Sequence, residues 1–373
     1  MAPLRLIPYT SKHLSSRAIF TATHFAHFES LILLPLTCFI MCVANFLLQR
    51  IGIKFVLVNL YLLNKTNMQN IPDIRAVPSR NAKSESIAVT VVIPTRNEER
   101  HLARCLGAIR RFSEVYVVDS QSTDSTAEVA RAFGAKVVQF HYHGGWPKKR
   151  QWALDTLPFE NEWVLLLDAD EVVTPGLADE IEEAIRDPNL VGYRIFLRIN
   201  FFGRELRFGG NGFWKMSLFR HDKGHFECRL RDQDPSMSDI EVHEHVVVDG
   251  CDGMLRQSLR HHNVESLERY LAKHNEYSNW EAKVLLQSTG QSDELPPALF
   301  GNQAQRRRWL KKRILGLPGS PLFFFLYKYV LRLGFLDGVP GLLYCVLQST
   351  YMFHIKAKIY ELQHSARSSP QRT

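Results

Sequence analysis

The chain has 373 residues, of which 45% are hydrophobic and 23% are charged, and its formal net charge at pH 7 is +8. This composition supports one large folded domain or two small ones, and it argues against disorder over most of the length. The six cysteines are scattered and only Cys38 and Cys42 lie close together, so the sequence shows neither a disulfide framework nor the spacing of a zinc site.

The first 66 residues contain two apolar runs. Leu31–Leu48 has about the minimum length that spans a bilayer, and Ile51–Leu63 is shorter. We expect one spanning helix with an interfacial helix, or a tight hairpin. A secretory signal peptide is disfavoured, because the first run starts late and no clean cleavage site follows it. Residues 67–86 are polar and contain two prolines, which predicts a linker.

Residues 87–290 have the pattern of an α/β domain, because β-branched runs alternate with segments of helical periodicity. This alternation predicts a parallel sheet with right-handed crossovers. The expected strands are 89–93, 115–118, 136–140 and 163–167, and the expected helices are 97–112, 125–133 and a segment from about 148. After residue 187 the pattern predicts an antiparallel extension followed by a long helix. These expected strands are 192–200, 213–219 and 241–248, and the helix covers about 264–286.

Residues 291–373 begin with a polar loop and continue with a basic cluster, formed by residues 306–308 and 311–313. Two apolar, aromatic segments follow, 321–329 and 339–354. Basic residues beside apolar segments are typical of binding to an anionic membrane surface, and we expect both segments to lie in the interface. A solvated helix face without a partner is the alternative.

Two carboxylates one residue apart, Asp168 and Asp170, follow the strand predicted at 163–167. Ligand sites in open α/β sheets form at the carboxyl ends of strands, and acids there suit a divalent cation bound together with substrate phosphates. The alternative is a role near the helix N-terminus predicted at Thr174. A second Asp-x-Asp triplet, at 232–234, has turn-like surroundings and is expected to be a solvated loop.

Polar residues also follow two other predicted strands. The turn after the first strand runs from Pro94 to Glu99, and the second strand ends in the stretch 119–124. Because these strand ends share one edge of the sheet, we expect the groups to lie near the acidic pair. Asn97 and Ser122 could instead simply cap helices. The chain has no Gly-x-Gly-x-x-Gly and no Walker lysine loop, which disfavours a dinucleotide Rossmann site.

Three of these stretches together resemble the family 2 glycosyltransferases, which are inverting enzymes of the GT-A fold. The stretches are Val91–Glu98, Val118–Asp124 and Leu167–Glu171. Later stretches resemble the branch that contains the lipopolysaccharide-core β-1,4-glucosyltransferases. They are Lys149–Asp155, Val242–Glu244, and His262 with Tyr270–Asn275. That branch usually has Gln-Lys-Asn where this chain has Lys149, Arg150 and Gln151. The expected fold class is therefore α/β of the GT-A type, with apolar membrane-associated segments at both ends.

The resemblance implies roles for individual residues. The donor nucleotide-sugar would contact Pro94, Thr95, Asn97, Glu98, Asp119, Arg150 and Asp168. Asp168 and Asp170 would hold a cation, Mg²⁺ or Mn²⁺, which offsets the negative charge that grows on the departing nucleoside diphosphate.

Inversion also requires a carboxylate that accepts the proton of the acceptor hydroxyl. Our candidate is Glu244. In the strand predicted at 241–248, alternation would place Glu244 on the face opposite His243 and His245. His243 is a candidate contact of the metal or the diphosphate, and ordinary packing is the alternative for both histidines.

Two further groups are expected to have structural roles. His261 and His262 would open the long helix as a cap or interface, and a role in the chemistry is the alternative. Trp146, Phe213 and Trp214 are expected in the core, and stacking on a sugar ring is the alternative.

The sequence thus predicts a membrane-associated hexosyltransferase. The expected donor is a UDP-hexose, and the expected acceptor is a lipid-linked, lipopolysaccharide or exopolysaccharide saccharide. The catalytic domain would be cytoplasmic at the inner membrane, and no nucleic acid is expected as a partner. The alternatives are a polyprenyl-phosphate glycosyltransferase, a sugar-phosphate nucleotidyltransferase, which the missing Gly-rich loop disfavours, a catalytically silent membrane scaffold, and a basic nucleic-acid binder.

Overall fold

The computed structural model describes residues 86–233, 238–241, 244–264, 266–287, 294–301 and 303–368. The chain divides into two units, Met1–Ser79 and Arg80–Thr373, and every described residue belongs to the second unit. The predicted N-terminal membrane segments (1–66) and all but the last residue of the predicted linker (67–86) lie outside the described residues.

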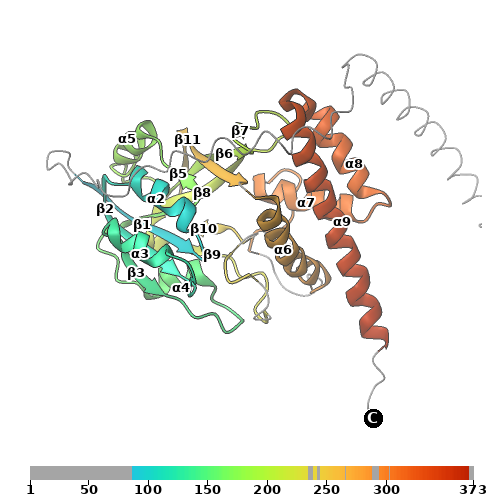
Figure 1. The fold of residues 1–373 in the computed structure, drawn as a ribbon, viewed down its shortest axis with the longest axis horizontal. Coiled ribbons are helices and arrows are strands. Elements are labelled where there is room, and N and C mark those ends of the chain that lie inside the picture. Colours follow the sequence, from blue (N-terminus) through green and yellow to red (C-terminus); the bar gives the residue numbers. More distant parts are fainter. Residues whose placement is uncertain are drawn as a thin grey trace, which may run out of the picture. The chain divides into compact units, whose positions relative to one another are not determined.

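A nine-stranded mixed sheet forms the centre of the second unit (Figure 1). Its strand order is β3-β2-β1-β4-β8-β6-β11-β5, and β7 pairs with β6. The bounds are β1 (Ile87–Thr95), β2 (Phe112–Asp119), β3 (Lys136–Gln139), β4 (Trp163–Leu166), β5 (Glu171–Val172), β6 (Gly192–Phe201), β7 (Arg204–Glu205), β8 (Phe213–Arg220) and β11 (Asp252–Val264). A separate ribbon pairs β9 (Gly224–Phe226) with β10 (Val246–Val248).

Strands β3, β2, β1 and β4 pair in parallel, which confirms the predicted parallel sheet. Helices connect them on both faces. The bounds are α2 (Glu99–Ala108), α3 (Thr126–Ala132), α4 (Lys149–Thr156) and α5 (Pro175–Ala184). β4 is apolar throughout because its residues alternate between two cores: Leu165 packs with α2 and α5, whereas Val164 and Leu166 pack with α4. Only the carboxyl end of this strand is open to polar chemistry, and Asp168 follows there.

The other half of the sheet differs from the prediction. β8 runs antiparallel to both β4 and β6, as expected, but β11 runs parallel to β6. The prediction of a single strand over 241–248 is wrong. Among the described residues of this stretch only Val246–Val248 forms a strand, and it pairs with β9 instead of the main sheet. The long strand β11 was not predicted. Its buried leucines, Leu255 and Leu259, are four residues apart and fit a helix as well as a strand.

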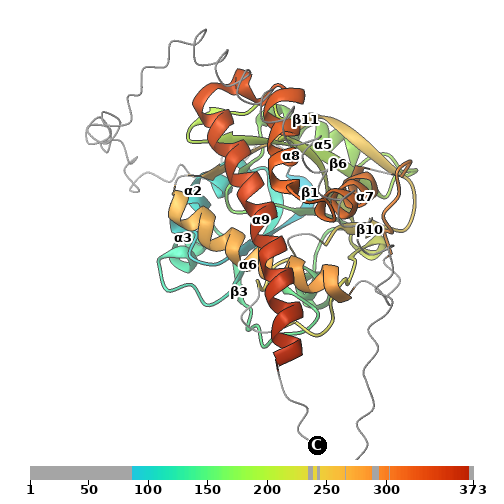
Figure 2. The same ribbon diagram turned by 90° about the vertical axis from the view of Figure 1, so that its right-hand side faces the viewer.

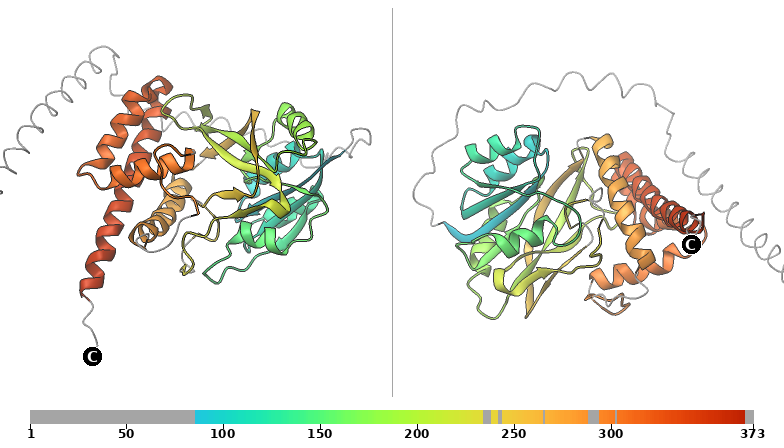
Figure 3. Two further views of the ribbon diagram at one scale, coloured as in Figure 1. Left: turned by 180° about the vertical axis from the view of Figure 1, so that it is seen from behind. Right: turned by 90° about the horizontal axis from the view of Figure 1, so that it is seen from below.

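The C-terminal part is helical. It contains α6 (Leu267–Gln287), α7 (Gln303–Leu315), α8 (Ser320–Leu326) and α9 (Gly338–Ser368), with η2 (Tyr327–Leu331) and η3 (Gly334–Asp337) between α8 and α9. α9 packs along α6 and beside α8 (Figure 2). Figure 3 shows the sheet between the N-terminal helices and this C-terminal layer. The predicted long helix is confirmed, and it begins at Leu267, after β11.

The two apolar segments predicted near the C-terminus, 321–329 and 339–354, lie in α8–η2 and in α9. Within the described residues, no single helix combines the length and the apolar composition of a membrane span. The stretches Ser320–Leu331 and Gly334–His364 satisfy both conditions only when taken together, and they are bent by 71° relative to each other.

Candidate active site

A cavity of about 580 Å³ lies at the carboxyl ends of β1 and β4 and extends across β6, β8 and β10. Its volume is in the range of small-molecule sites. Six residues predicted from the sequence line it, namely Pro94, Glu98, Arg150, Asp168, Asp170 and Glu244. The predicted residue His243 lies outside the described residues, as does Asp234 of the second Asp-x-Asp triplet; Asp232 is exposed, as expected.

The remaining predicted donor residues lie at the adjacent strand ends of β1 and β2. The Thr95 hydroxyl donates to Asp119 at 3.0 Å, and Asp119 also accepts a hydrogen bond from the Ser122 backbone N–H. Burial alone would raise the pKa of Asp119, but the hydrogen bonds from Ser122 lower it below its ordinary value. Asn97 has φ +56° and its side-chain oxygen accepts from the Thr123 N–H, so it fixes the turn. The predicted convergence at one sheet edge is confirmed.

Asp168 is held by two cations. It forms ion pairs with Arg150 from α4 and, at 3.0 Å, with Lys215 from β8. Lys215 also contacts Glu171 at 3.0 Å. Burial opposes ionisation of Asp168, but Arg150 and Lys215 keep its pKa well below the ordinary value. Asp168 is therefore a carboxylate whose oxygens are already partnered by protein cations.

Asp170 faces a different partner. Its Oδ1 lies 3.1 Å from His261 Nε2. His261 is in β11 directly opposite Glu171 of β5, which corrects the expectation that it opens the long helix. Despite burial, the contact with His261 lowers the pKa of Asp170 to about 2. The second ring nitrogen of His261, Nδ1, is buried and has no hydrogen-bond partner among the described residues.

Three consecutive cations at the start of α4 are buried. Lys148 pairs with Glu244 at 3.3 Å, Lys149 pairs with Asp239 at 3.1 Å, and Arg150 pairs with Asp168. Glu241 accepts hydrogen bonds from the backbone N–H groups of residues 150 and 151. These contacts bind the 239–244 segment to the sheet edge. This chain has Lys149, Arg150 and Gln151 where the family branch usually has Gln-Lys-Asn. Arg150 nevertheless provides a cation that contacts Asp168.

Glu244 is 5% exposed and lines the cavity. Its Oε2 faces Lys148, and its Oε1 has no hydrogen-bond partner in the described part of the chain. Burial raises the pKa of Glu244 to about 7, with Lys148 acting in the opposite direction. Because residues 244 and 245 precede β10, the expected strand alternation does not apply to them. His245 contacts Glu227 at 3.2 Å, which gives it a structural partner.

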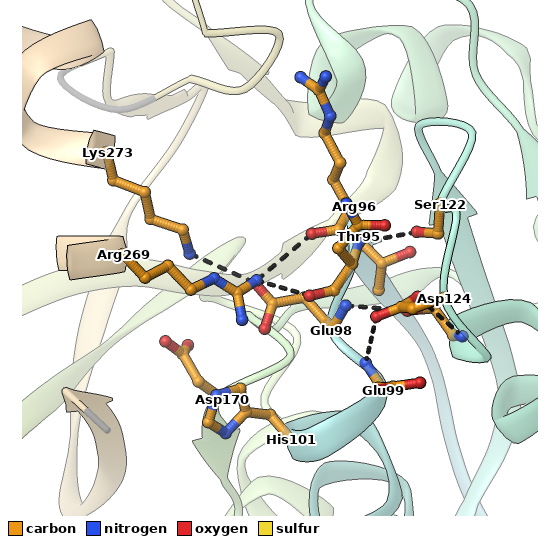
Figure 4. A network of polar contacts seen from close by, with 12 residues as sticks. Thr95, Arg96, Glu98, Glu99, His101, Ser122, Asp124, Asp170, Arg269 and Lys273 are labelled. Atoms are coloured by element: carbon orange, nitrogen blue, oxygen red, sulfur yellow. Dashed lines mark hydrogen bonds and ion pairs between the residues drawn. The ribbon is translucent and has the colours of Figure 1, made fainter. Parts of the chain in front are cut away.

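Helix α6 contributes two cations that sequence reasoning missed. Arg269 and Lys273 reach from α6 to Glu98, at 2.7 and 3.3 Å (Figure 4). Lys148 and Lys215 were missed in the same way. A charge that is buried by tertiary contacts has no local sequence signature, although the Tyr270–Asn275 motif contains Lys273.

The aromatic residues and the basic cluster divide into two groups. Phe213 and Trp214 line the cavity, whereas Trp146 packs in the core, as expected. In the basic cluster, Arg308 forms an ion pair with buried Glu227, and Lys311 forms one with Glu281. Part of this cluster therefore fixes α7 to the protein and is not available to a membrane.

The sequence matches the model of the family described as Glycosyl transferase family 2 over residues 90–262. An uncharacterized glycosyltransferase of Rickettsia conorii is 30% identical over 209 residues, which cover 55% of this chain and 72% of that protein. The chain belongs to glycosyltransferase family 2. The lipopolysaccharide core biosynthesis glycosyltransferase LpsC of Rhizobium meliloti is 26% identical to this family 2 enzyme over 288 residues, covering 74% of this chain and 92% of LpsC.

Two solved structures are similar to this family 2 glycosyltransferase. A mannosyltransferase from Pyrobaculum calidifontis, solved with GDP-Man and Mn²⁺, has a TM-score of 0.40 and 15% identity, covering 78% of this chain and 90% of its own. TarS of S. aureus, solved with UDP-GlcNAc, has a TM-score of 0.34 and 16% identity, covering 74% and 92%. The mixed α/β sheet described for residues 87–264 agrees with the α/β part of the predicted fold class.

Proposed function

We propose that this glycosyltransferase transfers a hexose, with inversion, from a nucleotide-sugar donor, a UDP-hexose, to a lipopolysaccharide or lipid-linked saccharide. Family membership supports the reaction type, and the similarity to a lipopolysaccharide core enzyme supports the acceptor class. The acidic pair and Glu244 lie in one cavity, as a donor site and an acceptor site must.

The observation that carries the proposal is the state of Glu244. It is buried in the cavity wall, its Oε1 is unpartnered among the described residues, and its pKa is raised to about 7. A general base works best when its pKa is near the operating pH, and such a base typically contributes ~10²–10⁴-fold to the rate.

Glu244 would act in a single displacement step. The acceptor hydroxyl oxygen attacks the anomeric carbon, its proton moves to a Glu244 oxygen, and the bond from the anomeric carbon to the diphosphate oxygen breaks. Arg150 and Lys215, which lie around Asp168, are placed to offset the negative charge of the departing diphosphate.

The residues around Asp170 fit a divalent cation. Carboxylate oxygens together with an imidazole nitrogen suit Mn²⁺, and carboxylate with phosphate oxygens suits Mg²⁺. Asp170 and His261 would hold the ion, and Asp168 would orient the cations beside it. The described residues contain no group of three or more acids, histidines or cysteines that could hold a metal, so donor phosphates and water would complete the coordination. Such an ion supplies Lewis acidity toward the diphosphate.

We also propose that the enzyme works at the inner membrane with its catalytic domain in the cytoplasm. The exposed apolar residues of α8, η2, η3 and α9 support binding to a lipid surface.

A thermal-shift screen of nucleotide sugars, with and without Mn²⁺, tests the donor proposal, followed by transfer assays on saccharide acceptors. We expect one donor to stabilise the protein only when the metal is present. A failure of every nucleotide sugar to bind would refute the proposal. Transfer to a polyprenyl phosphate that Glu244→Gln leaves unimpaired would favour the alternative acceptor, because a lipid phosphate needs no strong base.

A further inference from the structure

An apolar surface surrounds the bend between α8 and α9. It consists of residues from η2 through η3 to the start of α9, together with two phenylalanines that flank β7, and we call it the elbow face. Its exposed residues are Phe202, Phe208, Leu331, Leu333, Phe335, Leu336 and Val339. Leu331 is 74% exposed, Val339 is 66% exposed and Phe202 is 46% exposed, so these side chains lie on the surface and not at the edge of the core.

The two parts of the elbow face are far apart in sequence but are joined by specific contacts. The buried Asp337 accepts hydrogen bonds from the backbone N–H groups of Arg207 and Phe208, at 3.1 and 3.0 Å. The carbonyl of Arg332 accepts one from Gly209 at 2.8 Å. The bend is therefore fixed against the residues that follow β7, and Figure 1 shows β7 near the start of α9. The sequence pattern around β7 does not by itself indicate a membrane surface.

The charges of the elbow face have one sign. Arg204, Arg207 and Arg332 are exposed among its apolar residues. The segments 201–210 and 327–347 contain only two acids, and both have partners: Glu205 pairs with Arg198 at 2.9 Å, and Asp337 accepts the two backbone hydrogen bonds. Exposed large apolar residues with arginines and no free carboxylate match the hydrocarbon and the phosphates of an anionic lipid leaflet.

A second copy of the chain fits this surface less well. A self-complementary interface would bring the arginines of two copies together with no free acid between them. The bend itself is also typical of a helix pair that enters a bilayer and returns, since the two stretches meet the length and composition of a span only in combination.

We propose that the elbow face docks on an anionic lipid bilayer, with the β6–β7 turn and the α8–α9 bend inserting side by side. This inference rests on the membrane association in the proposed function and specifies its surface. The docked helices contact the cavity directly: Tyr344 of α9 lines it, and Gln348 of α9 donates to the hydroxyl of Tyr270, another lining residue, at 3.0 Å. Docking would therefore bring the cavity to the membrane plane, where a lipid-carried acceptor is held.

Tryptophan substitution in the full-length protein tests this docking independently of any anchoring by residues 1–66. Phe202→Trp and Leu331→Trp would be bound to phosphatidylglycerol vesicles that contain brominated lipid. We expect the added fluorescence of both variants to be quenched, because both side chains would reach the acyl region. Met254→Trp is the matched control: Met254 is 60% exposed on β11, and its replacement should remain unquenched.

The arginines give a second measurement. Arg204→Gln, Arg207→Gln and Arg332→Gln should each weaken the quenching signal of Phe202→Trp on anionic vesicles by about fivefold in apparent partitioning, and have no effect on neutral vesicles. Unquenched Phe202→Trp and Leu331→Trp on vesicle-bound protein would overturn the proposal. A dimer in solution that Leu331→Trp disrupts would overturn it as well. Neither readout requires catalysis, so a failed transfer assay would refute the proposed function and leave the docking result intact.

Discussion

Replacing Glu244 with glutamine tests the mechanism most directly, because Gln has the shape and the neutral charge of protonated Glu. The proposed base is lost, so we expect kcat to fall by ~10²–10⁴-fold. Donor binding should persist, since Glu244 forms its ion pair with Lys148 and not with the acidic pair. For the wild type, kcat/KM should rise with pH through about 7, as the base becomes deprotonated.

The same substitution should stabilise the fold. The pKa of Glu244 rises from 4.5 to about 7 in the folded protein. A raised acid pKa means that the native state loses stability as pH rises from 4.5 to 7, because ionisation is easier in the unfolded chain. At ~1.4 kcal/mol per pKa unit, this cost reaches about 3 kcal/mol at pH 8. Glu244→Gln removes the cost, so its melting temperature should exceed that of the wild type at pH 8 and match it near pH 4.

The assay combines initial rates from pH 5.5 to 8.5 with thermal melts from pH 4 to 8.5. Loss of activity together with a gain in stability is the result expected for a catalytic carboxylate whose ionised form destabilises the fold. Near-normal turnover by Glu244→Gln would refute the assignment of Glu244 as the base. A variant that loses activity and stability together at pH 8 would show that Glu244 has a structural role.

Four other substitutions probe the surrounding charges. Glu227→Gln is the opposite-sign control: pairing with His245 and Arg308 lowers the pKa of buried Glu227 to about 2, so its contribution is present above pH 4.5 and is lost as pH falls toward 2. Melts at pH 7 should show that this variant is destabilised by about 3 kcal/mol. If the variant is as stable as the wild type, the ion pair of Glu227 with Arg308 does not stabilise the fold. Lys148 lowers the pKa of Glu244, so Lys148→Met should raise this pKa further and move the pH–rate profile to higher pH. An unchanged profile would show that Glu244 does not set the pH dependence of the rate. Asp170→Ala and His261→Ala should each abolish the Mn²⁺-dependent thermal shift by a donor, and a normal metal response would exclude that residue as a ligand.

Several features could be predicted because they depend on neighbouring residues. The apolar run of β4 and its flanking turns predicted a buried strand, and a buried strand exposes polar groups only at its end, where Asp168 lies. The same reasoning placed Thr95, Asp119 and the acidic pair at one edge, which the structure confirms. Patterns that repeat every two or every 3.6 residues carry this information within a short segment.

The partners of these groups could not be predicted in this way. His261 lies opposite Glu171 only because β11 enters the sheet between β6 and β5, and the two residues are far apart in the chain. The pairing of Lys215 with Asp168 and of Lys148 with Glu244 depends equally on strand order. The residue types and strand ends of the site thus follow from local sequence, whereas tertiary packing alone decided which charges meet and how far burial moves their pKa values, because both depend on distances between segments that are remote in sequence.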